Sequence, residues 1–185
     1  ARTSGFRLPP RCTYRRRERV ERRQARTTCR ALPNFFALFA IYAMCMATPK
    51  QAKRVYDISK HISSQARKYV YGGGHRVPLG DINPGDGLDC SSSVCLVLKR
   101  CGMWRGRYAG VSGSFKNWGQ PGRGRYFTVW YNERHVWIEF HGGTDVFGQY
   151  KRFDTSPWGW GGRGPRVRKN RRPHYGFQAR HWPGL

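Results

Sequence analysis

The chain of 185 residues is near the usual size of a single domain and is long enough to bury a real core. Its 35 Lys and Arg against 10 Asp and Glu give a formal net charge of +25, which attracts polyanions such as nucleic acid, anionic lipid or cell-wall polymers without choosing among them. The six cysteines form no Cys-x-x-Cys pair, and the six histidines are not spaced beside them like zinc ligands. We therefore predict no metal site and no cofactor, and a disulfide stays open.

Residues 1–47 differ in composition from the rest of the chain. Residues 1–30 are crowded with arginine and have no sustained apolar face, which favours a solvated, poorly ordered arm. The apolar stretch 35–47 is too short to span a bilayer comfortably. It is similar to a secretory signal or anchor-like segment, and a helix packed on the next domain is the alternative. We predict a basic arm over 1–47 and a folded domain over 48–185.

A helix is predicted to begin at Thr48. Pro49 suits the first helical position, and Gln51 stands three residues after the capping threonine. Apolar residues then recur at helical spacing, at Val55, Ile62, Ala66 and Tyr69. This helix leads into the folded domain.

Cys90 stands where a glycine-rich loop meets an apolar helix. The first turn of a helix offers unpaired N–H groups and a positive dipole end, and both stabilise a thiolate. Asp89 and three serines surround Cys90, whereas Cys95 and Cys101 lie inside the apolar helix, where a cysteine is a small buried hydrophobe. The helix is expected to stop at Gly102. Cys90 is therefore the candidate nucleophile.

Three later segments are rich in aromatic and β-branched residues, which predicts strands over 126–132, 135–141 and 150–155. The segment 102–125 is predicted to be irregular. The segment 159–173, rich in Gly, Pro and Arg, is predicted to be an exposed basic surface. A thiol-bearing helix packed on an antiparallel sheet predicts an α+β fold.

The second predicted strand begins with His135. Alternation places His135 on the face opposite Val136, Ile138 and Phe140, where its ring can meet Cys90. Asp154, in the third strand, is the candidate acid that orients the imidazole, and Glu139 and Asp145 are the alternative acids. Cysteine, histidine and a polar orienter together are the arrangement of a thiol hydrolase. Two further histidines are better explained as surface or structural residues, namely His75 and His141.

Four motifs in this order resemble the NlpC-type papain-like cysteine peptidases, which cut bacterial cell walls. That family shows a Tyr-x-Trp-Gly-Gly, an Asp-Cys-Ser-Gly and a His-Val-Gly-Ile segment. The matching segments here are Tyr69–Gly73, Leu88–Val94 and His135–Ile138, followed by Phe153–Ser156. The resemblance covers residues 50–185, and the closing segment 176–185 is similar to the actinobacterial and phage-borne branch. Tyr71 and Ser92 depart from the pattern, standing where the family has Trp and Gly.

The resemblance implies a papain-like α+β fold and hydrolysis of amide bonds in peptidoglycan stem peptides by Cys90, His135 and Asp154. It further implies three substrate or oxyanion residues, which are Tyr69, Asp89 and Ser91, with Asp89 binding a free amino group of the stem peptide. On physical grounds alone Asp89 is equally well explained as a helix N-cap. Tyr69 is better explained as a packed aromatic residue.

The implied partners are peptidoglycan and other anionic cell-wall polymers, with virion proteins added if the protein belongs to a phage. The expected location is extracellular or cell-wall-associated, or alternatively in a phage virion. Two other classes stay open. Arginine runs interleaved with aromatics favour a basic nucleic-acid-binding protein, although no recognition helix or zinc finger supports it. The second class is a structural component that keeps this fold without catalytic activity. The presence of both Cys90 and His135 argues against it.

Overall fold

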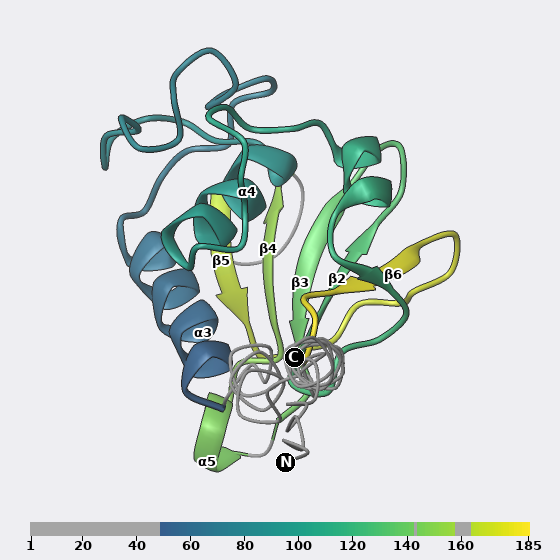
Figure 1. Cartoon of the computed structure of the whole chain (residues 1–185). Helices are drawn as coiled ribbons and strands as arrows, with labels where there is room; N and C mark the ends of the chain where they lie inside the picture. Colours follow the sequence, from purple (N-terminus) through teal and green to yellow (C-terminus); the bar gives the residue numbers. More distant parts are fainter. Residues whose placement is uncertain (1–48, 143, 158–163) are drawn as a thin grey trace, which may run out of the picture. The chain divides into compact units, whose positions relative to one another are not determined.

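The computed structural model describes residues 49–142, 144–157 and 164–185 (Figure 1). The predicted basic arm, the apolar stretch 35–47 and the predicted cap Thr48 lie outside these residues. No helix in this described part of the chain is both long and apolar enough to cross a membrane.

The first described helix, α3, spans Pro49–Ser64 and begins at the proline that the sequence predicts. Its buried face is formed by Ala52, Val55, Tyr56, Ser59 and Ile62. The prediction that the apolar stripe continues to Ala66 and Tyr69 is wrong. Ala66 adopts a φ of 52°, a left-handed conformation that ends the helix, and Tyr69 pairs instead with Leu88 in an isolated parallel bridge.

The second helix, α4, spans Cys90–Arg100, and every residue from Cys90 to Leu98 is buried. Asp89 is its N-cap and forms a capping box with Ser92, so the N-cap interpretation of Asp89 is confirmed. After the helix, Gly102 has a φ of 76°, which suits a glycine at the predicted stop.

The described residues form a six-stranded antiparallel sheet with the order β1-β6-β2-β3-β4-β5. The bounds are β1 Gln120–Pro121, β2 Phe127–Tyr131, β3 Val136–Phe140, β4 Arg152–Ser156, β5 Gly164–Arg168 and β6 Gln178–His181. Helices α3 and α4 lie on one side of the half formed by β3, β4 and β5 (Figure 1), and the four-residue helix α5, Thr144–Phe147, precedes β4. The α+β class is therefore confirmed.

Two irregular-segment predictions need correction. The segment 102–125 contains a 3-10 helix, η1, over Ser112–Asn117, and the short strand β1. The segment 159–173 is not simply an exposed surface, because β5 pairs along β4 and buries Gly164 and Pro165. Glycine- and arginine-rich composition disfavours a strand, but pairing with β4 supplies the missing stabilisation.

Strands β2 and β3 are buried on both faces. One face carries Val129, Ile138 and Phe153 into the apolar core beneath α3 and α4. The opposite face carries Trp130, Trp137 and Glu139 and is covered by the segment 171–177, which stacks His174 on Trp130 with ring centroids 3.9 Å apart. The sheet therefore separates an apolar layer from a polar aromatic layer.

Candidate active site

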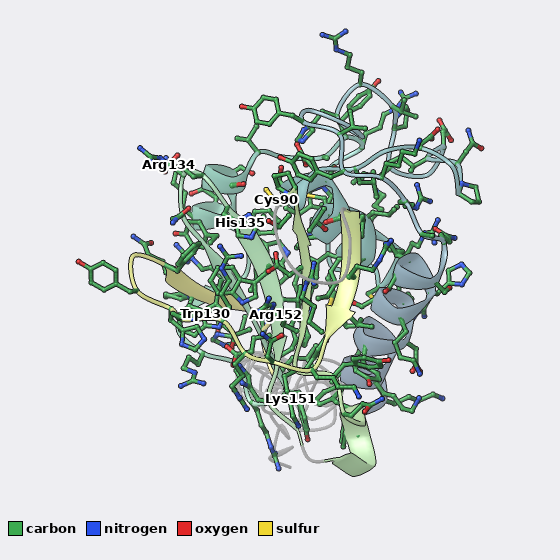
Figure 2. The ribbon with its side chains drawn as sticks, turned by 180° about the vertical axis from the view of Figure 1, so that it is seen from behind. Cys90, Trp130, Arg134, His135, Lys151 and Arg152 are labelled. Atoms are coloured by element: carbon green, nitrogen blue, oxygen red, sulfur yellow. The ribbon has the colours of Figure 1, made fainter. Side chains whose placement is uncertain are left out.

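Cys90 is the first residue of α4, and only 9% of it is exposed. Its Sγ lies 3.5 Å from the hydroxyl oxygen of Ser112, and the imidazole of His135 is near enough to lower the pKa of the thiol. Figure 2 shows Cys90 and His135 next to each other at one end of the sheet. The thiol therefore combines a helix N-terminus with a cationic neighbour, the two features that favour a thiolate.

His135 directly precedes β3 and is held by a tight turn. The side-chain oxygen of Asn132 accepts the backbone N–H groups of Arg134 and His135, at 2.9 Å each. The ring nitrogen Nε2 lies 2.9 Å from Oδ1 of Asp154. Because Nε2 faces the carboxylate, Nδ1 is the nitrogen left for the thiol.

Asp154 lies in the middle of β4, and only 1% of it is exposed. Continuing the register of β3 and β4 from the pair Ile138–Phe153 places Asp154 opposite Trp137. Trp137 follows His135 by two residues and therefore lies on the same face of the sheet. Of the alternative acids, Glu139 is engaged elsewhere, by Arg171, His174 and Trp130. The side chain of Asp145 lies outside the described residues.

The three groups shift one another's pKa values. Burial raises the pKa of the Cys90 thiol, but hydrogen bonds to His135 and Ser112 outweigh it and hold that pKa below the ordinary value. Burial lowers the pKa of His135, but its bonds to Asp154 and Cys90 raise it to about 9. Burial opposes ionisation of Asp154, yet its bond to His135 and the neighbouring cations keep its pKa lowered. Each of the three shifts therefore acts in favour of a charged thiolate–imidazolium pair.

The Asp89 carboxylate has two separate sets of partners. Oδ1 accepts the backbone N–H of Ser92 at 2.8 Å and the hydroxyl of Ser91 at 3.1 Å. Oδ2 faces Nε2 of His75 at 2.9 Å, and that nitrogen also lies 3.3 Å from the Ser91 hydroxyl. His75 therefore belongs to the site and is not merely a surface histidine, because the long loop after Gly74 returns it to the start of α4.

Tyr69 lies beside the residues that lead into α4. Its neighbour Val70 donates a backbone N–H to Leu88 O at 3.2 Å, and Leu88 N donates to Lys68 O at 3.1 Å. Burial and the negative charges of Cys90 and Asp89 raise the pKa of the Tyr69 hydroxyl, which places this side chain near the nucleophile. All six residues singled out in the sequence thus lie around the start of α4.

Sequence reasoning missed Ser112, Asn132 and Arg172. Ser112 begins η1, and Arg172 lies against Asp154. Each reaches the site from a segment with no motif of its own.

A cavity of about 610 Å³ lies at the other end of α4, away from Cys90. It is lined by residues that include Trp104, Trp118 and Trp182.

The other described cysteines differ from Cys90. Cys95 and Cys101 are also free thiols; burial raises the pKa of Cys95, and it raises the pKa of Cys101 to about 12. His141 sits away from the thiol, with Nε2 2.6 Å from the hydroxyl of Thr128, as a structural histidine would. Among the described residues, no group of three or more His, Cys, Asp or Glu is placed to hold a metal ion.

Comparison of the chain with protein-family models, with curated proteins and with solved structures found no match.

Proposed function

We propose that the protein is a cysteine endopeptidase of the papain-like NlpC type that hydrolyses amide bonds in peptidoglycan stem peptides. The observation that carries the proposal is the Cys90 thiol at the start of α4, with its pKa lowered by the neighbouring His135, whose Nε2 lies 2.9 Å from Asp154 Oδ1. Nucleophile, base and orienter in mutual reach define this class of chemistry. The choice of peptidoglycan rests on the resemblance of the four motifs.

The reaction follows from the arrangement. The Cys90 thiolate attacks the amide carbonyl, and the Cys90 backbone N–H and the Tyr69 hydroxyl are the candidate donors to the oxyanion. The Nδ1 proton of His135 moves to the departing amine, which leaves a thioester on Cys90. Water then adds to the thioester with His135 as base, releasing the carboxylic acid and restoring the thiolate.

Asp89, Ser91 and His75 form the candidate contact for the stem peptide. The Asp89 carboxylate is 7% exposed and adjoins the nucleophile, so a free amino group of the substrate would meet a negative charge there. Nε2 of His75 lies 2.9 Å from Oδ2 of the same carboxylate. We place the enzyme at the cell wall or in a phage virion, where its basic residues would meet anionic wall polymers.

Digestion of purified peptidoglycan, with mass analysis of the released fragments, tests the proposal. Cys90→Ala and His135→Ala should each reduce cleavage by orders of magnitude, since both act on the same step. Asp154→Asn should cost less, because a thiolate–imidazolium pair persists without its third member. Lys169→Gln, at an exposed residue outside the site, is the control and should stay active. Full activity of Cys90→Ala would refute the proposal.

A further inference from the structure

The Asp154 carboxylate has more partners than an orienting acid needs. Oδ1 lies 2.9 Å from His135 Nε2, while Oδ2 accepts a hydrogen bond from Arg172 Nη1 at 3.1 Å and pairs with Arg152 Nε at 3.2 Å. Asp154 is almost fully buried, so both of its oxygens are held by protein groups. One carboxylate thus joins one imidazole and two guanidinium groups.

Arg172 differs from Arg152 because it also contacts the histidine. Its Nη1 lies 3.2 Å from Nε2 of His135, and its guanidinium stacks on Trp137 at 5.1 Å and on Phe177 at 6.0 Å. Both aromatic rings also pack around His135. The guanidinium therefore sits against the carboxylate and the imidazole at once, in a fixed plane.

The segment carrying Arg172, here called the strap, comprises residues 171–174 and is anchored to the sheet by Glu139. Glu139 is fully buried, and its two oxygens receive Arg171 on one side and His174, at 2.6 Å, on the other. The indole N–H of Trp130 donates to the same carboxylate at 2.7 Å. Anchors on both sides of Arg172 hold its side chain over Asp154.

From this geometry we infer that Arg172 is a positioning residue of the same thiol site, which fixes the Asp154 carboxylate and keeps it ionised, so that the carboxylate supports the imidazolium of His135. The inference rests on the proposed function. An ionised Asp154 facing Nε2 supports the charged form of His135. Arg172 holds Oδ2 at 3.1 Å, which keeps the carboxylate ionised with Oδ1 directed at Nε2.

The sign of the effect can be measured on the thiol without any substrate. Loss of Arg172 removes a cation from Asp154, so the carboxylate should protonate at a higher pH and cease to support the imidazolium there. The Cys90 thiolate then also loses support at a higher pH. The acid limb of Cys90 alkylation by iodoacetamide is the pH range in which the rate falls as the thiolate is protonated. In Arg172→Gln this limb should move upward by about 0.5–1 pH unit. The shift stays this small because Arg152 still pairs with Asp154.

Three variants separate this positioning role from a merely structural one. Arg172→Lys keeps the cation and should leave the acid limb within about 0.3 unit of the wild type. Lys169→Gln removes an exposed charge three residues away, and it should not move the limb. In an Asp154→Asn background, Arg172→Gln should shift the limb by less than half as much, because the two residues act through each other.

An unmoved acid limb in Arg172→Gln, or an equal shift in the Asp154→Asn background, would overturn the inference. A limb shifted as strongly by Arg172→Lys as by Arg172→Gln would overturn it as well. Arg172 is 34% exposed, and far-UV circular dichroism checks that each variant is folded. Because alkylation needs no peptidoglycan, a wild type that fails to cleave peptidoglycan but shows the expected limb shifts refutes the proposed function and leaves this inference standing.

Discussion

At the residue scale, the reactivity of the site depends on how the cost of burial is offset. Cys90, His135 and Asp154 are largely buried, and burial by itself favours their neutral forms. The interaction of the thiol with the imidazole, and of the imidazole with the carboxylate, reverses that tendency for all three groups. Cys95, on the same helix, has no such partner row, and its pKa is raised.

Selective alkylation is the first consequence at this scale. At about pH 5.5 an ordinary thiol is ionised in roughly one molecule per thousand, and Cys95 and Cys101 are ionised still less. Iodoacetamide at that pH should therefore label Cys90 at least about tenfold faster than any other cysteine of the chain. Peptide mapping by mass spectrometry after a short exposure reads the labelled position. Equal labelling of several cysteines would contradict the lowered pKa of Cys90.

The pH dependence of peptide hydrolysis is the second consequence. As pH falls through the lowered pKa of Cys90, the thiolate is protonated and kcat/KM should fall. As pH rises through about 9, His135 loses the proton that the leaving amine needs, and kcat/KM should fall again. A profile measured from pH 4 to 10.5 should be bell-shaped with its alkaline limb near 9. An alkaline limb near the ordinary histidine value, about 6.5, would show that Asp154 does not support the ring.

At the element scale, α4 brings the thiol to the histidine. The buried hydroxyls of Ser93 and Thr155 lie 2.6 Å apart and join the first turn of α4 to β4, the strand that carries Asp154. The turn closed by Asn132 sets where β3 begins and hence where His135 stands. The distances within the site are therefore set by contacts between neighbouring elements rather than by flexible loops.

The close contact between the backbones at Gly73 and Gly87 can be tested directly. A Cβ on Gly73 would lie 2.5 Å from the carbonyl oxygen of Gly87, a backbone atom just ahead of the nucleophile. Gly73→Ala should therefore displace this segment, lowering both the unfolding midpoint and activity, at a cost of about 1–3 kcal/mol. Gly85→Ala meets nothing within 4 Å and is the matched control. Thermal unfolding and Cys90 alkylation rates measure the two effects, and equal behaviour of both variants would contradict the packing.

At the scale of the whole molecule, the 35 Lys and Arg far outnumber the 10 Asp and Glu that could pair with them, which leaves a net charge of +25. In the described part of the chain, Glu139 pairs with Arg171, and Asp154 pairs with Arg152 and Arg172. Asp57 pairs with Lys53 on α3. Many Lys and Arg side chains are therefore left to face solvent or a partner. Such an excess favours adsorption on an anionic surface.

We expect this charge to retain the protein on wall sacculi in a salt-dependent way. Retention should weaken steeply as salt screens the charges, yet persist at about 0.15 M. Co-sedimentation with sacculi, compared with a panel of DNA and RNA sequences at the same salt, measures it. Nucleic acid should also bind as a polyanion, without sequence preference. Sequence-selective binding at that salt, with no retention on sacculi, would favour the nucleic-acid-binding alternative.

The local elements can be predicted from the amino-acid sequence. The start of α3 at Pro49, the N-cap at Asp89, the stop at Gly102 and the strands β2, β3 and β4 all follow from patterns within a few residues. Capping, helical period and β-propensity depend on residues that are close together in the chain, so they can be recognised from the sequence. The candidates Cys90, His135 and Asp154 were found in the same way, from their places at the edges or within these elements.

The set of residues around the thiol, in contrast, depends on tertiary contacts. Ser112, His75 and Arg172 reach the site through chain segments with no periodic pattern of their own, and β5 becomes a strand because β4 offers it a paired edge. That Asp154 rather than Glu139 meets the His135 ring is also a tertiary contact, because Arg171 and His174 of the strap hold Glu139 elsewhere. The physical reason is that these contacts join residues far apart in the chain, and their energies exist only once the sheet has formed and folded those segments back upon it.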